Sequence, residues 1–191
     1  MTTLHVGIDS WIIQDGNYPD YRVGEASSFA LEFYPQSLRA SHERSLRRER
    51  LFGSHYRITG KVVFVAKQVW VIDFGFLAFQ NQAPPRVASK GQWIHADIYL
   101  GIDPIFYFES LYSLPGMPSL KYEFRVREIQ LETTPRLTSR DEHGRTSLKR
   151  GESRRSFQPV PEADAWKDDD GHGVRIDRGL TGQGYPGNHG Y

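Results

Sequence analysis

The chain has 191 residues, with 24 Lys and Arg against 23 Asp and Glu, and it contains no cysteine. The lack of cysteine excludes disulfides, thiolate zinc sites and a cysteine nucleophile. Residues 1–135 hold 14 basic and 14 acidic residues, a balance that argues against general electrostatic binding of nucleic acid. No run reaches the roughly 18 apolar residues of a membrane-spanning helix, and the first residues lack a signal-peptide pattern, so we expect a cytoplasmic protein without a membrane partner.

Two parts of the chain differ in composition. Residues 1–135 are rich in Val, Ile, Leu, Phe and Tyr and are numerous enough to bury a hydrophobic core. Residues 136–191 hold few large apolar residues, and their charges come in blocks: seven basic and three acidic residues in 136–155, then a mainly acidic stretch in 162–170. Such a composition does not offset the entropy lost on ordering the backbone. We therefore predict one folded domain over 1–135 and a low-complexity, disordered tail over 136–191.

The first half of the folded part indicates two strands and a helix. Residues 4–8 alternate between apolar and other side chains, and the phase slips after them, as at a β-bulge. After a turn-rich segment, SFALEFYP (28–35) predicts a strand with Glu32 facing outward, and Pro35 ends it. The many good helix formers in 37–52 favour a helix, although its apolar positions are sparse.

The second half continues the pattern of period two. YRITGKVVFV (56–65) and VWVIDFGFLAF (69–79) predict two strands joined by a hairpin, the second with a bend at its glycine. Residues 93–102 predict a third strand. Residues 103–116 then favour a helix that begins with an Asp-Pro pair and ends at Pro-Gly, and KYEFRVREIQL (121–131) predicts the last strand, with a phase slip near its end.

These elements favour an all-β fold. So few helices cannot cover both faces of a parallel sheet, which points to antiparallel pairing. The order strand, strand, strand, helix, strand over residues 55–131 resembles the OB-fold, in which a helix follows the third strand and caps the barrel. We predict an OB-like antiparallel barrel of about six strands over 1–135 with one short capping helix, and a β-sandwich is the alternative.

The stretch GQWIHADIYLGIDP (91–104) has the most regular alternation in the chain. Because successive side chains of a strand point to opposite faces, one set belongs to the core and the other to the surface. The predicted core set is Ile94, Ala96, Ile98, Leu100 and Ile102, and the predicted surface set is Trp93, His95, Asp97 and Tyr99.

No set of residues forms a recognisable catalytic or metal site. His95 and Asp97 lie about 7 Å apart on one strand face, but they supply only two ligands, and a metal site needs a third or fourth. The segment DDDGHG (168–173) lacks the opening Asp and the closing Glu of a calcium loop. Nucleophile and phosphate-loop motifs are absent, so we predict no cofactor, no metal, no catalytic residues and no enzymatic activity.

A protein partner is the interpretation that needs the fewest assumptions. The surface set of 93–99 combines aromatic and charged side chains, as interfaces do. The segment 106–117 carries more apolar residues than one barrel cap requires. We predict an intracellular, non-enzymatic adaptor of an accessory or immunity-protein kind, with a partner surface formed by Trp93, His95, Asp97, Tyr99, Phe108, Tyr112 and Met117.

Single-stranded nucleic acid is the alternative partner. OB-like barrels bind single strands with aromatic side chains on their strands and with basic residues around them. The basic residues on the surface parity of the predicted strands are Arg57, Lys61, Arg125 and Arg127. An enzyme is the third hypothesis.

Overall fold

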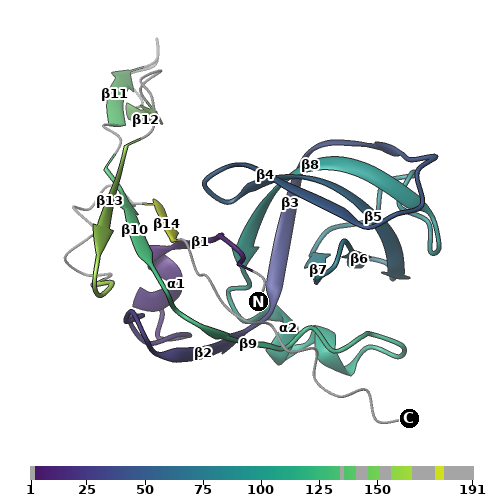
Figure 1. Ribbon diagram of the computed structural model, residues 1–191, viewed down its shortest axis with the longest axis horizontal. Helices are drawn as coiled ribbons and strands as arrows, with labels where there is room; N and C mark the ends of the chain where they lie inside the picture. The colour runs from purple at the N-terminus through teal and green to yellow at the C-terminus, as the bar shows by residue number, and fades with distance from the viewer. Residues whose placement is uncertain (1–2, 134–135, 141–145, 151–155, 165–174, 179–191) are drawn as a thin grey trace.

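The computed structural model describes residues 3–133, 136–140, 146–150, 156–164 and 175–178. These residues form mainly β-structure (Figure 1), with two short helices, α1 (Ser10–Gln14) and α2 (Phe106–Glu109), and one 3-10 turn, η1 (Leu111–Ser113). Among the described residues, none of the helices combines the length and the apolar composition needed to cross a bilayer.

Five strands close into a barrel. They are β3 (Leu31–Ala40), β5 (His55–Val65), β6 (Trp70–Asp73), β7 (Leu77–Gln80) and β8 (Trp93–Ile102). Around the barrel the order is β8-β3-β7-β6-β5, and β5 pairs with β8 to complete the circle. All neighbouring pairs are antiparallel except β3 and β7. The prediction of an all-β barrel is confirmed.

Further strands extend the main sheet or pair beside it. β4 (Arg47–Phe52) pairs with β5, β1 (Val6–Asp9) lies beside β8, and β14 (Arg175–Arg178) pairs with β1. A separate ribbon joins β2 (Ala26–Phe29) to β9 (Tyr122–Arg125). The strand after the predicted capping helix therefore pairs outside the barrel, and the OB-like strand order is not confirmed.

A long two-stranded ribbon leaves the body of the protein after β9. Its inner part pairs β10 (Ile129–Glu132) with β13 (Phe157–Val160), and its outer part pairs β11 (Arg136–Arg140) with β12 (Thr146–Arg150). Figure 1 shows β11 and β12 at the far end of this ribbon, away from the barrel. Parts of the predicted tail thus belong to the described structure, while most of the prediction of disorder concerns residues outside the described ranges.

The barrel interior is filled by the predicted core faces. Trp70 is fully buried, contacts Phe33 edge to face with ring centroids 4.8 Å apart, and donates from Nε1 to Oε1 of Gln80 at 2.9 Å. The predicted core set of β8 is confirmed, since each member is at most 3 % exposed: Ile94, Ala96, Ile98, Leu100 and Ile102.

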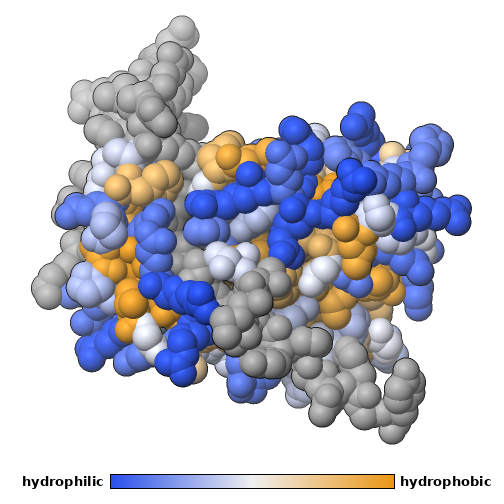
Figure 2. Space-filling model, viewed as in Figure 1, coloured by the Kyte–Doolittle hydropathy of each residue, from blue (hydrophilic) through white to orange (hydrophobic). Residues whose placement is uncertain are grey.

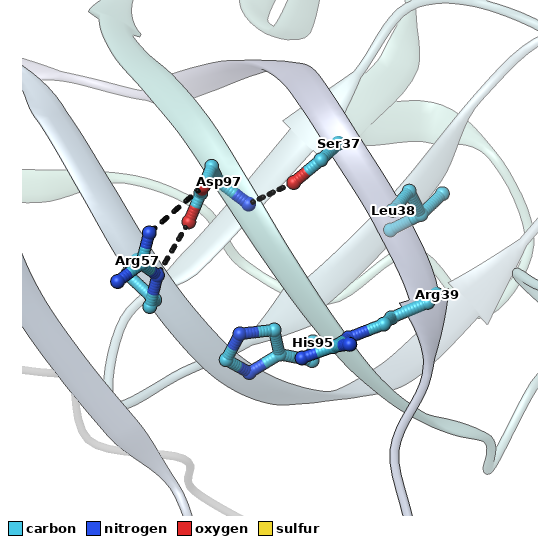
Figure 3. A pocket seen from close by; sticks show the side chains of 6 residues that line it. All are labelled: Ser37, Leu38, Arg39, Arg57, His95 and Asp97. Carbon is cyan, nitrogen blue, oxygen red and sulfur yellow. Dashed lines mark hydrogen bonds and ion pairs between the residues drawn. The ribbon is translucent and has the colours of Figure 1, made fainter.

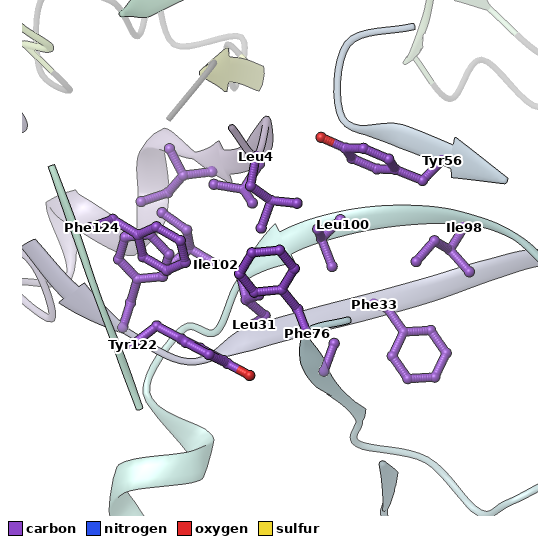
Figure 4. Close-up of a cluster of buried hydrophobic side chains, with 14 of the residues drawn as sticks. Leu4, Leu31, Phe33, Tyr56, Phe76, Ile98, Leu100, Ile102, Tyr122 and Phe124 are labelled. Carbon is purple, nitrogen blue, oxygen red and sulfur yellow. The ribbon is translucent and has the colours of Figure 1, made fainter. Parts of the chain in front are cut away.

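The same hydrophobic core continues outside the barrel. Leu4 and Ile102 extend it towards α1 and the β2–β9 ribbon (Figure 4). There Phe29 and Phe124 stack with ring centroids 4.8 Å apart. Ala163, which follows β13, is 1 % exposed and belongs to this cluster. Its amide donates to the carbonyl of Tyr21 at 2.8 Å, so the end of the ribbon is fixed to the body of the protein.

The prediction of a helix over 37–52 is wrong. These residues form the end of β3 and the whole of β4, which pair with β8 and β5 respectively. Arg, Glu and Leu are good helix formers, but intrinsic propensity is a weak determinant of structure, and pairing with distant strands outweighs it. The phase slip after residue 8 predicted a β-bulge, but a helix, α1, begins there at Ser10.

The strand predicted over 28–35 is two strands. β2 ends at Phe29, and β3 begins at Leu31 and continues through Pro35. The register of β3 on β8 shifts between Pro35 and Ser37. This bulge accommodates the proline, which has no N–H to donate to the ladder.

The helix predicted over 103–116 is shorter, consisting of α2 and η1. It begins at Phe106, two residues later than predicted, with Ile105 as its N-cap. The carboxylate of Asp103 still accepts the amide hydrogens of Phe106 at 3.0 Å and Tyr107 at 2.9 Å, so it satisfies the first donors of the helix as a cap does. Tyr107 packs with Phe79 of β7 in a second hydrophobic cluster. The helical segment therefore covers the outer side of β6 and β7 and does not enter the barrel.

Candidate functional site

The outward side chains of β3, β8, β5 and β4 lie in cross-strand register and form rows across the sheet. Residues directly opposite each other on neighbouring strands are close enough to interact. We call this surface the outer face, and its members are Tyr34, Ser37, Arg39, Arg47, Glu49, Phe52, His55, Arg57, Thr59, Lys61, Trp93, His95, Asp97 and Tyr99.

One row of the outer face is aromatic. Tyr34 and Tyr99 have ring centroids 6.1 Å apart, Tyr99 and His55 5.3 Å, and His55 and Phe52 4.3 Å. The two central rings are buried, whereas Tyr34 is 41 % and Phe52 is 49 % exposed. The row thus presents an aromatic ring to solvent at each end.

Tyr99 is buried because β1 passes directly over it. A Cβ atom added to Gly7 would lie 1.7 Å from the Tyr99 hydroxyl oxygen, so only glycine fits at this position. Tyr99 is 6 % exposed, the least exposed of the four residues predicted as the surface set of β8. Its ring fixes β1 against β8, while Trp93, His95 and Asp97 are half-buried.

The next row is built on an ion pair. Arg57 donates from Nε and Nη2 to the two carboxylate oxygens of Asp97, at 2.9 and 3.2 Å, and the amide of Asp97 donates to Oγ of Ser37 at 3.1 Å. The hydrogen bonds from Arg57 lower the pKa of Asp97 below its usual range. Glu49 stands opposite Arg57 on β4. Charges of opposite sign therefore alternate along this row.

A third row contains His95. Its Nδ1 lies 3.2 Å from Oγ1 of Thr59, and Arg39 stands opposite it on β3. Arg47, opposite Thr59 on β4, forms an ion pair with Glu43 at 2.6 Å. The row is basic at both ends, but one of its arginines is already paired.

Two shallow grooves cross these rows. The first, of about 420 Å³, is drawn in Figure 3 and is lined by Ser37, Leu38, Arg39, Arg57, His95 and Asp97. The second, of about 330 Å³, lies between β4 and β5 and shares Arg57 and His95 with the first. Hydrophilic side chains dominate the surface over β4 and β8 in Figure 2. The grooves and the rows together form the candidate binding site.

A buried carboxyl group beside this surface was missed by sequence reasoning. Glu32, predicted to face outward, is only 4 % exposed, and its Oε2 has no hydrogen-bond partner among the described residues. Burial raises the pKa of Glu32 to about 7, against a hydrogen bond from the Tyr34 hydroxyl that lowers it. Burial also raises the pKa of Asp103, to about 6. Alternation on β3 correctly excluded Glu32 from the barrel interior, but it gave no sign that other segments cover the outside.

The remaining predicted partner residues lie elsewhere. Tyr112 is 60 % exposed, while Phe108 and Met117 are half-buried against the second hydrophobic cluster. Figure 1 places α2 at the opposite end of the barrel from β4. The predicted partner surface is therefore two separate patches.

The residues predicted for nucleic acid are also divided. Arg57 and Lys61 are exposed on β5, where Lys61 stands opposite Trp93. Arg125 and Arg127 are exposed at the end of β9 and beyond it, and Arg125 donates to the carbonyl of Gly24 at 2.9 Å. The four residues do not form one basic surface.

The described ranges contain no group of three or more His, Asp or Glu side chains that could hold a metal ion. The chain matches no model of a protein family, no curated protein and no solved structure.

Proposed function

We propose that the protein is a non-enzymatic, cytoplasmic binding module, of an accessory or immunity-protein kind, that joins a protein complex through the outer face. The observation that carries this proposal is the register of the rows: charged pairs in the middle, with exposed aromatic rings at both ends of the neighbouring row. Arginine and aromatic side chains are enriched at protein interfaces, and aromatic anchors supply much of the binding energy.

The charge pattern favours a protein over a polyanion. Arg57 is already engaged by Asp97, and Arg47 by Glu43. A phosphate approaching either arginine would meet a carboxylate, whereas a protein surface with the complementary alternation would satisfy both signs. Alternating charges also exclude partners of the wrong pattern, which gives specificity.

The second candidate is an OB-like module for single-stranded nucleic acid. The observation in its favour is the pair of Lys61 and Trp93 directly opposite each other on β5 and β8, a cation beside an aromatic ring. Stacking on such rings binds bases without sequence preference. This pair lies at one end of the outer face, so both candidates predict contacts there.

Site-specific photocrosslinking in the source cells separates the two candidates. A photoreactive phenylalanine analogue replaces Trp93, and the matched control carries it at Val23, an exposed position next to β2 that is outside the outer face. We expect a discrete protein adduct from position 93, none from position 23, and no change of the adduct after nuclease treatment. A nuclease-sensitive adduct would favour the second candidate, and equal adducts at both positions would contradict a specific surface.

A charge exchange tests whether the adduct depends on the pattern. Arg57→Asp combined with Asp97→Arg keeps an ion pair within the protein but reverses the charges that a partner meets. We expect this variant to remain folded and to lose the adduct at position 93. An unchanged adduct would show that the alternating charges do not contribute to recognition.

A further inference from the structure

The two-stranded ribbon that leaves the body forms an arm. Its base is fixed: Ile129 is fully buried, and Leu131 and Val160 pack against the main core. Beyond this base, the amide of Thr133 donates to the carbonyl of Ser156 at 3.0 Å, so the two segments of the ribbon are still paired where they leave the body. β11 and β12 continue the ribbon from there (Figure 1). We call these two strands the arm.

The composition of the arm differs from that of the rest of the chain. β11 is RLTSR and β12 is TSLKR, so ten residues include four basic and four hydroxyl residues and no acidic residue. Lys and Arg supply most contacts to nucleic-acid phosphates, and Ser and Thr are common additional donors. In contrast, residues 1–135 hold equal numbers of basic and acidic residues.

The register of the arm places two arginines at directly opposite positions. Arg136 is the direct cross-strand partner of Arg150. Like charges directly opposite each other destabilise a strand pair, and a two-stranded ribbon is only marginally stable alone. An anion bound at this place would remove the repulsion. We therefore expect this pair of strands to be more stable with an anion bound than without one.

We propose that the arm binds the sugar-phosphate backbone of duplex DNA, with the ribbon lying in the major groove. Paired strands are about 4.8 Å apart, and the major groove of B-form DNA, about 12 Å wide, admits a two-stranded ribbon. Five residues of strand span about 17 Å, or half a turn of the duplex. Double-stranded RNA has a deep, narrow major groove that does not admit such a ribbon.

This site is independent of the outer face. It uses residues that neither candidate function invokes, and it lies at the end of a ribbon that leaves the body of the protein away from the barrel (Figure 1). A protein partner on the outer face and DNA on the arm would make the protein a link between the two.

Fluorescence anisotropy with a labelled duplex of about 20 base pairs tests the proposal on the full chain, over a range of salt concentrations. Each neutralised phosphate changes the slope of log affinity against log salt by about −0.9, so four contacts give about −3.6. The test variant replaces the four basic residues by glutamine: Arg136→Gln, Arg140→Gln, Lys149→Gln and Arg150→Gln. We expect its affinity at low salt to fall about 30-fold or more and its slope to approach zero.

A matched control removes the same charge from exposed positions outside the arm and the outer face. It carries Arg44→Gln, Arg86→Gln, Lys90→Gln and Lys121→Gln, and we expect its affinity to stay within about threefold of the unchanged chain. A third variant keeps the charge of the arm and should keep the affinity: Arg136→Lys, Arg140→Lys, Lys149→Arg and Arg150→Lys. Its binding shows that loss in the test variant comes from charge and not from misfolding.

Three results would overturn the proposal. The duplex would fail to bind at low salt, the control variant would lose as much affinity as the test variant, or the charge-preserving variant would lose affinity. Equal affinity for duplex RNA or for a polyglutamate of the same charge would show a general polyanion or protein-binding site instead. None of these results bears on the crosslinking from the outer face, so the two proposals fail separately.

Discussion

The outer face and the arm are both rich in charge, but they arrange it differently. On the outer face Arg57 pairs with Asp97 and Arg47 with Glu43. The two strands of the arm, β11 and β12, together hold four basic residues and no acidic residue. Paired charges contribute to register and to recognition of a complementary surface, whereas an excess of charge of one sign attracts a polyanion. The number of basic residues alone would not distinguish the two regions.

The two regions also differ in how they are supported. The outer face is the other side of strands whose inner side chains fill the barrel, so the core holds these strands in place. The arm is connected to the body through its base, β10 and β13. Changes in the barrel should therefore alter stability, and changes in the arm should alter binding with little effect on stability.

The largest expected effect comes from Tyr99. Replacement by alanine removes a ring that packs between Tyr34, His55 and Gly7, and truncating a buried aromatic side chain typically costs about 4 kcal/mol. Trp93→Ala, at a half-buried position on the same strand, should cost about 1 kcal/mol. Urea denaturation measures both free energies of unfolding. Equal costs would mean that Tyr99 is no more structural than Trp93.

Gly7 supplies a control for this prediction. Gly7→Ala should destabilise the unchanged protein, because its Cβ would overlap the Tyr99 hydroxyl. In the Tyr99→Ala background the same substitution should cost much less, since the space is then vacant. Additive costs in this double-mutant cycle would contradict the contact.

A smaller effect concerns pH and Glu32. Its pKa is about 7 in the folded protein, against 4.5 as the ordinary value, so the folded state binds a proton that the unfolded state has released between these pH values. The contribution of Glu32 to the free energy of unfolding is therefore most favourable below about pH 4.5. It falls, by at most about 3 kcal/mol, as the pH rises through about 7.

Glu32→Gln should make the free energy of unfolding less dependent on pH in this range, because glutamine does not titrate. Asp103, whose pKa is raised to about 6, remains in the variant and should leave a weaker slope of the same sign. Unfolding free energies measured from pH 5 to pH 8 check both statements. A variant with the same slope as the unchanged protein would show that Glu32 is not the group responsible.

The arm should have little effect on barrel stability. Replacing residues 134–155 by an Asn-Gly turn would join Thr133 to Ser156, which are already paired. We expect the free energy of unfolding to change by less than about 0.5 kcal/mol, because no described barrel contact is removed. DNA binding should disappear. A large fall in the melting temperature would instead mean that the arm packs on the barrel.

The smallest effect is expected from the Arg57–Asp97 pair. Both side chains are accessible to water, and exposed ion pairs contribute little to stability and are screened by salt. Arg57→Ala should lower the melting temperature only slightly at low salt and not at all in concentrated salt. A loss of stability that persists in high salt would contradict a pair whose role is recognition.

The predictions from sequence succeeded where one strand determines its own environment. The alternation in β8 identified its core side chains, because period two places every second residue on the same face. It failed where distant strands decide, as in 37–52, whose residues become β4 only through pairing with β5. The burial of Glu32 depends on what covers the outside of β3, and no local pattern carries that information.

The candidate site could be predicted only in part. Alternation placed His95 and Asp97 on one face, but the partner of Asp97 is Arg57, 40 residues away, and only the register of β5 on β8 brings them together. The arm was hidden for a different reason. Its sequence is too polar to indicate strands, and its pairing follows from the base formed by β10 and β13.

Amide chemical-shift mapping with the DNA duplex tests the central contrast most directly. We expect shifts confined to residues 136–140 and 146–150, two strands that hold basic but no acidic residues, and none at Ser37, Arg57, His95 or Asp97 on the outer face. Shifts on the outer face, with none in the arm, would mean that paired charges on the barrel bind DNA and would contradict the division of roles between the two regions.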